Sequence, residues 1–141
     1  MITVVDASVA AKWFLASDTE EDDGDIALQI LREAADRTLD LYQPPHFLGE
    51  VSSVLARLKP KQALLDVRDL LEIDFRRVDD AEIYAIATAL AIELDHHVFD
   101  TLYHAVALAT PDATLVTADR RYYAKARHEG QVMLLNRWRR A

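Results

Sequence analysis

The pattern of apolar and polar positions along the chain alternates between two periods. Short β-branched or apolar runs, typical of buried strands, are separated by longer segments with apolar residues three and four positions apart, which is typical of amphipathic helices. We predict strands at 2–5, 39–43, 73–78, 113–117 and 132–135. The predicted helices begin after Ser8 and cover 25–35, 44–58, 61–71, 79–93, 99–109 and the segment after Asp119.

Turn and cap residues indicate where two of these helices begin. Thr19 and Asp22, three positions later, resemble a capping pair before the helix at 25–35. Pro44 and Pro45 end a strand and suit the first turn of the next helix. Strands that alternate with helices predict a parallel sheet covered on both faces. With 141 residues, 51% of them hydrophobic, the chain can bury one core, so we expect a single domain.

Composition removes several classes of protein. The absence of cysteine excludes disulfides, thiolate metal sites and cysteine nucleophiles. The N-terminus lacks the basic region of a secretion signal, and the longest apolar run, "IYAIATALAI", is far below the roughly 18 residues of a membrane span. With 3 glycines there is no Gly-rich phosphate loop. We therefore expect a soluble cytoplasmic protein.

Charge is distributed unevenly along the chain. The formal net charge of −8 argues against a phosphate-binding protein. However, residues 120–141 contain 7 basic side chains and a single acid, Glu129, whereas residues 1–119 contain 9 basic and 23 acidic ones. The basic tail is either a solvated terminal helix or a surface for a polyanion.

Two aspartates follow predicted strands where the next helix begins. Asp6 directly follows the run "ITVV", and Asp119 lies two positions after the strand at 113–117. Ligands of parallel sheets bind beyond the carboxyl ends of the strands, so both carboxylates are candidates for one site. Asp112 precedes its strand and is expected at the opposite edge. Each aspartate also has a structural interpretation, because an acid at a strand-to-helix junction commonly caps the helix.

Two further acids lie in helices that are mostly apolar. Glu50 falls beside Phe47 and Val54 on the flank of an apolar stripe, where it can point into a cleft or serve as an ordinary boundary residue. Asp100 belongs to "FDTLYHAVALA", whose apolar character predicts a buried helix. A buried carboxylate must be paired, capped or bound to a metal. The alternatives for Asp100 are a helix cap, a partner such as His104, and a ligand role.

The chain resembles the PIN-domain ribonucleases, and most closely the VapC-type toxins of bacterial toxin–antitoxin modules. The fragments that carry the resemblance are, in order, "VVDASVAAKWF", "PPHFLGEVSSVL", "FDTLYHAVALA", "TLVTADRRY" and "VMLLNRW". The resemblance implies a PIN-like three-layer α/β/α fold with a central parallel sheet of about five strands. It also implies an acidic active site made of Asp6, Glu50, Asp100 and Asp119, with Thr117 as a supporting residue.

Four neighbouring carboxylates require a cation or protons. At about 4 Å, one pair repels by about 4 kcal/mol at an effective dielectric constant near 20. An all-oxygen site favours Mg²⁺ or Mn²⁺ over zinc. Such a metal activates water for in-line attack on a phosphodiester, so the resemblance implies a metal-dependent endoribonuclease that leaves a 5′-phosphate and a 3′-hydroxyl. Asp6, Asp100 and Glu50 would hold the principal metal, and Asp119 a second or water-mediated contact.

The chain departs from the family pattern beside this site. Many family members carry a further acid two positions after the last aspartate, where this chain has Arg121. Whether one or two metals bind therefore stays open. We predict that basic residues bind the RNA backbone instead. These residues are Arg120, Arg121, Lys125 and Arg127.

The resemblance also implies partners. A VapB-type antitoxin would place its C-terminal segment in a groove beside the active site, and the toxin would form a homodimer. The helices after Thr19 and Pro60 are the expected groove walls. Four histidines are interpreted as structural or surface residues: His46, His96, His97 and His128.

Two other functions stay open. A phosphoaspartate phosphatase or receiver-like domain also has acids at strand ends, but Ala7 and Ser8 follow Asp6, so the DxD of a phosphatase is absent. The receiver interpretation leaves Glu50 without a use. A catalytically silent binding module of the same fold would have no use for the four acids. The sequence does not distinguish tRNA, ribosomal RNA and mRNA as substrates, because base choice depends on the shape of the groove.

Overall fold

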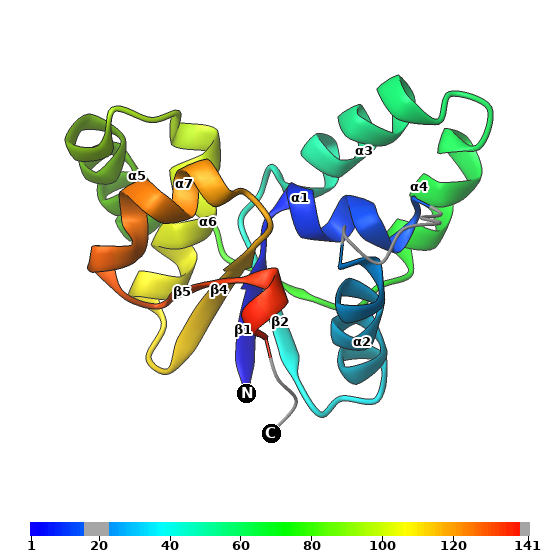
Figure 1. Ribbon diagram of the computed structural model, residues 1–141, viewed down its shortest axis with the longest axis horizontal. Coiled ribbons are helices and arrows are strands. Elements are labelled where there is room, and N and C mark those ends of the chain that lie inside the picture. Colours follow the sequence, from blue (N-terminus) through cyan, green and yellow to red (C-terminus); the bar gives the residue numbers. More distant parts are fainter. Residues whose placement is uncertain (16–22, 139–141) are drawn as a thin grey trace.

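A five-stranded parallel β-sheet forms the centre of the protein. The structure is a computed structural model that describes residues 1–15 and 23–138 (Figure 1). The strand order is β3-β2-β1-β4-β5, and every strand pair is parallel, as predicted. The strands are β1 (Ile2–Val5), β2 (Asp40–Gln43), β3 (Arg76–Arg77), β4 (Ala113–Thr117) and β5 (Val132–Leu134).

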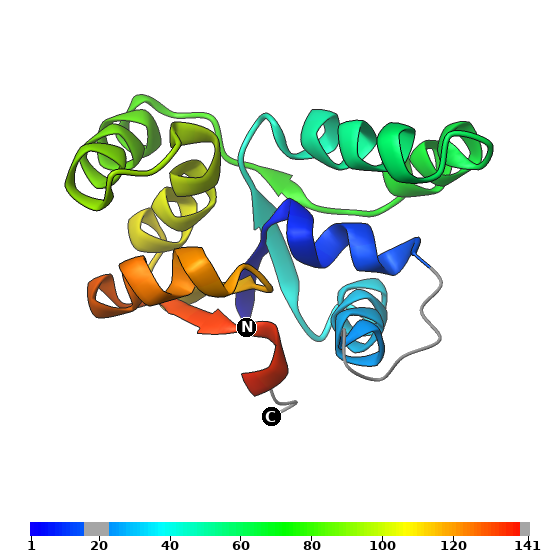
Figure 2. The same ribbon diagram turned by 45° about the horizontal axis from the view of Figure 1, so that its top comes forward.

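Helices cover both sides of the sheet and confirm the three-layer α/β/α fold. Helices α1 to α4 lie on one side, and α5, α6 and α7 on the other (Figures 1 and 2). Helix α6 packs on β1, β2 and β4, and α5 packs on α6. The α-helices are α1 (Ala7–Ala10), α2 (Gly24–Ala35), α3 (Phe47–Leu58), α4 (Ala63–Leu71), α5 (Ala81–Leu94), α6 (Val98–Ala109) and α7 (Arg120–Ala126), with 3₁₀ turns η1 (Ala11–Trp13), η3 (Arg127–Glu129) and η4 (Leu135–Arg137).

Several predicted boundaries differ from the structure, two of them at β3 and α3. Only two residues of the predicted strand 73–78 form β3, an edge strand whose Arg76 and Arg77 are both exposed. Short, charged edge strands resist pairing with other chains. Helix α3 begins at Phe47, so Pro44 and Pro45 lie in the turn before it rather than in its first turn. The predicted capping pair at Thr19 and Asp22 lies outside the described residues.

The core lies between the sheet and the helices on each side. The β1 and β4 side chains that face the helices are buried, and α6 is buried from Thr101 to Ala107, as its apolar sequence predicts. A helix that is apolar on nearly every side needs this double cover, which the sheet and α5 provide. None of the described helices is long and apolar enough to span a membrane.

Gln43 joins β1 to β2 where their backbone pairing ends. The β1–β2 register runs from Ile2 opposite Asp40 to Thr3 opposite Leu41. Beyond it, the buried amide of Gln43 accepts a hydrogen bond from the Val5 N–H (2.9 Å) and donates one to the Val5 carbonyl (2.7 Å). The side chain therefore satisfies the last backbone groups of β1.

The connections change side between β1 and β4. Strand β1 leads into α1 and α2 on one side of the sheet, whereas β4 leads into α7 on the other (Figure 1). Such a reversal between neighbouring parallel strands leaves a crevice at their carboxyl ends, where ligands of this fold class bind. Asp6 and Asp119 follow these two strands.

Candidate active site

Asp6 lies at the carboxyl end of β1 and caps α1. Its Oδ1 accepts hydrogen bonds from the backbone N–H groups of Ser8 (3.1 Å) and Val9 (3.3 Å). Burial raises the pKa of Asp6 to about 6, although hydrogen bonds from Ser8 and Thr117 act against this rise. The negative charge of Asp119 raises the pKa further. A cation would favour the charged form that burial disfavours.

Two hydroxyl groups join Asp6 to the end of β4. The buried Thr117 hydroxyl donates to Asp6 Oδ2 and accepts from the backbone N–H of Asp119 (3.0 Å). The Ser8 hydroxyl donates to Asp6 Oδ1 and accepts from the backbone N–H of Ala118 (3.1 Å). The ends of β1 and β4 are thus held together by side chains as well as by the sheet, and Thr117 lies between the two aspartates.

Asp119 caps α7, as its position after β4 suggested. Its Oδ1 accepts a hydrogen bond from the backbone N–H of Tyr122 (3.0 Å). A ligand atom of Asp119 also lies within 4.8 Å of ligand atoms of Asp100 and His96. Capping and ligand roles are therefore compatible at this residue, because a carboxylate has two oxygens.

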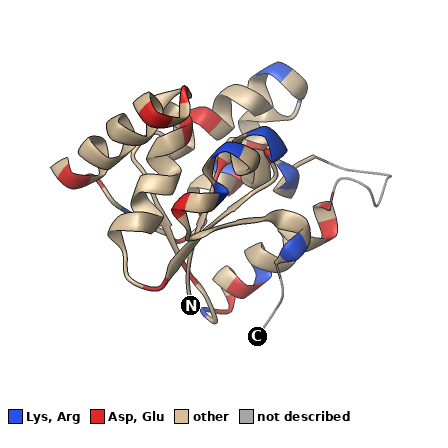
Figure 3. Ribbon diagram, turned by 60° about the vertical axis from the view of Figure 1, so that its left-hand side comes forward, with Lys and Arg blue, Asp and Glu red and all other residues tan. Residues whose placement is uncertain are grey.

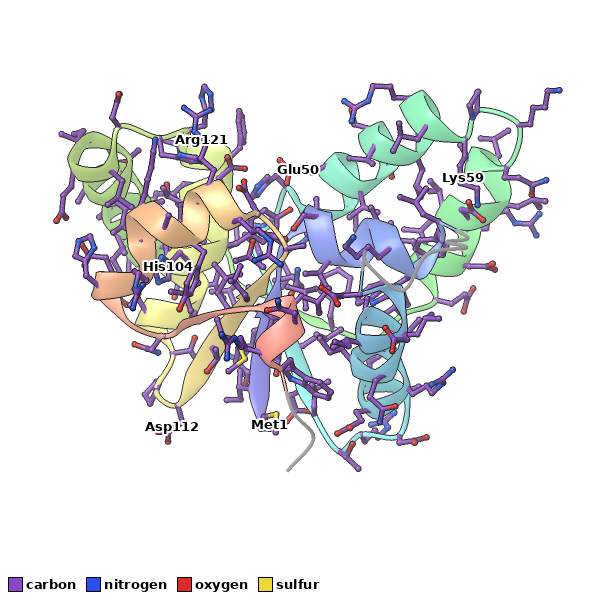
Figure 4. The ribbon with its side chains drawn as sticks, viewed as in Figure 1. Met1, Glu50, Lys59, His104, Asp112 and Arg121 are labelled. Carbon is purple, nitrogen blue, oxygen red and sulfur yellow. The ribbon has the colours of Figure 1, made fainter. Side chains whose placement is uncertain are left out.

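Glu50 lies in the first turn of α3 and faces α6. Its Oε1 accepts a hydrogen bond from the Tyr103 hydroxyl (2.8 Å), and its Oε2 lies 4.0 Å from His46 Nε2. Burial raises the pKa of Glu50, and the charge of Asp100 raises it further. Figure 4 shows Glu50 at the opposite end of the molecule from Asp112. The side chain therefore points inward from the flank of the α3 stripe.

Asp100 lies in the first turn of α6 and pairs with His96. Its Oδ2 is 2.9 Å from His96 Nε2. The prediction that His104 pairs with Asp100 is wrong, because both ring nitrogens of His104 have other partners. Its Nδ1 lies 2.8 Å from the Tyr122 hydroxyl, and its Nε2 lies 2.8 Å from the Gly130 carbonyl. Asp100 is also not the cap of α6, which begins after His97 without a side-chain cap.

Two buried tyrosines lie among the four acids. Burial is the main cause of a raised pKa at Tyr103, and the charges of Glu50, Asp6 and Asp100 add to it. Burial also raises the pKa of Tyr122, with contributions from acids that include Asp100, Asp6 and Asp119. Acids from three different segments contribute to the pKa of each tyrosine, so the four carboxylates share one electrostatic environment.

These residues fit a divalent cation. Asp100, Asp119 and His96 offer ligand atoms within 4.8 Å of one another, while Asp6 and Glu50 lie outside this group of three. Burial is the main cause of the raised pKa values of Asp6 and Glu50, and the charges of Asp119 and Asp100, respectively, add to it; a bound cation would offset both effects. Carboxylate oxygens are the ligands that Mg²⁺ and Mn²⁺ prefer.

His96, interpreted from the sequence as a structural or surface residue, belongs to this site. Its ring is nearly buried, with 9% of the side chain exposed, and it contacts the Tyr122 ring edge to face at 5.0 Å. The signal available in the sequence was its spacing, because His96 precedes Asp100 by four residues.

The basic residues that follow Asp119 lie in different environments. Figure 3 shows basic positions along α7. Arg121 and Lys125 line a pocket of about 280 Å³ with His96 and His97. Arg120 lines a separate pocket with Lys12, and the Arg127 guanidinium lies over the Tyr123 ring at 5.9 Å.

Comparisons with known proteins agree with this architecture. The model of the PIN domain family matches residues 3–128. No curated protein matches in sequence. Three solved structures share the fold at low sequence identity, each covering most of both chains.

VapC20 of Mycobacterium tuberculosis, a toxin that cleaves the sarcin–ricin loop, is 19% identical with a TM-score of 0.63 over 86% of this chain and 94% of its own. VapBC2 of Rickettsia felis, bound to a DNA fragment from its promoter, is 18% identical with a TM-score of 0.64 over 95% of this chain and 97% of its own. PAE2754 of Pyrobaculum aerophilum is 21% identical with a TM-score of 0.62 over 96% of this chain and 93% of its own. Because the family model spans most of the sequence, the chain belongs to the PIN domain family.

Proposed function

We propose that this chain is a VapC-type toxin, a metal-dependent endoribonuclease that hydrolyses RNA phosphodiester bonds. The observation that carries the proposal is the gathering of acids at the carboxyl ends of β1 and β4. Thr117 binds Asp6 and the backbone of Asp119, Tyr103 of α6 binds Glu50, and Asp100 and Asp119 offer ligand atoms within 4.8 Å of each other. The similarity to VapC20, which cleaves an RNA loop, supports RNA as the substrate.

The chain's own residues hold and orient the carboxylates. Bound Mg²⁺ or Mn²⁺ supplies charge neutralisation and an activated water at such a site. The four acids would hold the metal, and Asp100 and Asp119 offer ligand atoms within 4.8 Å of each other. Hydrogen bonds from Thr117 and Tyr103 fix Asp6 and Glu50 before a metal arrives. Little reorganisation is then needed on binding.

Basic side chains beside the acids would bind the RNA backbone. Arg120 and Arg121 are exposed at the start of α7, directly after Asp119. Arg121 borders the pocket that contains His96 and His97. A guanidinium binds phosphate bidentately and is always charged, so it holds the substrate without titrating near neutral pH. Local positive charge on α7 thus offsets the overall net charge of −8.

Cleavage of labelled RNA tests the proposed function. We expect the purified chain to cut RNA with Mg²⁺ or Mn²⁺, to stop in excess EDTA and to recover when the metal is returned. The products should carry 5′-phosphates, which ligation-based sequencing of RNA ends reports. Undiminished cleavage in EDTA, or no cleavage of tRNA, ribosomal RNA or mRNA with either metal, would reject it.

A VapB-type antitoxin is the proposed protein partner. Helix α4, one of the two expected groove walls, exposes three large apolar side chains to solvent: Leu64 (83%), Leu65 (55%) and Leu71 (61%). Exposed apolar surface of this kind is typical of a protein-binding site. The second wall, α2, begins at Gly24. We expect an apolar segment of the antitoxin to cover α4.

We also propose a homodimer formed through α5. Its sequence, "AEIYAIATALAIEL", is apolar almost all round, which is typical of a helix covered on all sides. One side packs on α6, but Ile92 is 78% exposed and Tyr84 is 42% exposed. A second copy of the chain would cover them.

The substitution Ile92→Glu should therefore convert the dimer to monomers. The charge would be buried at the interface without a partner, which costs several kcal/mol. Size-exclusion chromatography with light scattering measures the mass. Leu71→Glu is the matched control, since Leu71 is 61% exposed on a different helix, and it should leave the mass unchanged. A dimer that survives Ile92→Glu would contradict the α5 interface.

A further inference from the structure

We propose that His96 and Lys125 are positioning residues that hold Asp100 in its metal-binding orientation. The inference rests on the proposed function. It gives a new role to two residues that were interpreted differently from the sequence, His96 as a structural or surface residue and Lys125 as a contact to RNA. Three segments meet at this point: the α5–α6 turn, the first turn of α6 and the last turn of α7.

A continuous chain of hydrogen bonds runs from α7 to Asp100. The Lys125 ammonium lies 3.2 Å from His96 Nδ1 and donates to the Asp95 carbonyl at 2.8 Å. On the other side of the ring, His96 Nε2 lies 2.9 Å from Asp100 Oδ2. Asp95 ends α5 in the left-handed conformation (φ 51°), which turns its carbonyl toward the lysine.

The ammonium determines which ring nitrogen carries the proton. An ammonium group has donors and no acceptor, so His96 Nδ1 must accept from Lys125. In the neutral ring Nε2 then carries the hydrogen and donates it to Asp100. The lysine therefore selects the form of His96 that binds the carboxylate. This arrangement also argues against metal ligation by His96 Nε2, because ligation needs the lone pair that the hydrogen occupies.

Packing fixes the orientation of the ring. The His96 side chain is 9% exposed and contacts the Tyr122 ring. Tyr122 is itself held in place, because its backbone N–H donates to Asp119 and its hydroxyl bonds to His104. The imidazole cannot turn away from Asp100 without disturbing this contact. One oxygen of Asp100 is held by His96, and the other is left for a metal. Partners that orient a ligand in this way commonly affect metal affinity by about 10- to 100-fold.

Nitrogen-15 NMR of the metal-free chain tests the tautomer directly. We expect the ring nitrogens of neutral His96 to show the Nε2–H form, and Lys125→Met to lose this preference while Lys125→Arg keeps it. Lys61→Met removes the same charge from the turn between α3 and α4 and should leave the signals unchanged. An Nδ1–H signature in the unmodified chain would overturn the inference.

Direct Mn²⁺ binding, followed by electron paramagnetic resonance, tests the consequence. His96→Gln keeps an N–H donor near Asp100 and should stay within about threefold of the parent affinity, whereas His96→Ala should lose about 10- to 100-fold. Equal losses in both variants would mark His96 as a metal ligand and overturn its positioning role. If His96→Ala does not fold, His96→Gln and Lys125→Met still decide. Neither measurement needs RNA cleavage, so a chain that binds metal as expected but cuts no RNA would reject the proposed nuclease alone.

Discussion

The substitution Asp6→Asn is expected to lower RNA cleavage by at least about 100- to 1,000-fold, which is the usual effect of removing one well-placed electrostatic group from an active site. The change removes a negative charge and keeps the shape of the side chain. Asparagine is also a good helix cap, so its Oδ1 can still accept from the N–H groups of Ser8 and Val9. The variant should therefore fold and fail only in metal binding and cleavage.

Asp112→Asn is the matched control for this experiment. It is the same chemical change at the opposite edge of the sheet, before β4 (Figure 4). Asp112 has a left-handed backbone conformation (φ 64°), which asparagine tolerates well. We expect cleavage at the parent rate, measured under the same Mg²⁺ concentration. Full activity in Asp6→Asn, or an equal loss in Asp112→Asn, would contradict the assignment of the site.

The fold could be predicted because its elements have strong local patterns. The strands at 2–5 and 113–117 have the predicted bounds, since each is a short apolar run limited by polar residues. Of the predicted strand at 73–78, only Arg76 and Arg77 form a strand in the structure. Its apolar residues Ile73 and Phe75 pack on the core from a connecting segment instead of from the sheet. Local periodicity does not distinguish these two ways of burying an apolar side chain.

The topology of the sheet selected Asp6 and Asp119, but local spacing misassigned the partner of Asp100. His96 and His104 both lie four residues from Asp100, but helix geometry favours His104, because His96 precedes the helix that holds Asp100. The choice depends on distant groups. Tyr122 and Gly130 bind the two nitrogens of His104, while Lys125 approaches His96 from α7. Likewise, the amide of Gln43 reaches β1 from a strand 38 residues away.

The second large effect concerns stability. Without metal and above about pH 6, Asp6→Asn should be more stable than the unmodified chain by about 2 kcal/mol. The pKa of Asp6 rises from 3.8 to about 6 on folding, chiefly through burial. The folded chain therefore binds more protons than the unfolded chain between these values, and the free energy of unfolding falls as pH rises through this window. Full linkage would give about 3 kcal/mol, which partial solvent contact reduces. Asparagine does not titrate and avoids this loss.

Urea unfolding between pH 4 and 8 measures the difference, with Asp112→Asn as the control that should keep the parent profile. The raised pKa of Glu50 acts in the same direction but is present in every variant, so it cancels in the comparison. A divalent metal should reverse the order of stability. At a hundredfold excess over its dissociation constant, bound Mg²⁺ or Mn²⁺ adds about 2.7 kcal/mol to the unmodified chain, and much less to Asp6→Asn. If the metal stabilises both chains equally, Asp6 is not part of its site. If the metal-free difference between the two chains is the same at pH 4 and pH 8, burial of the Asp6 charge is not the cause.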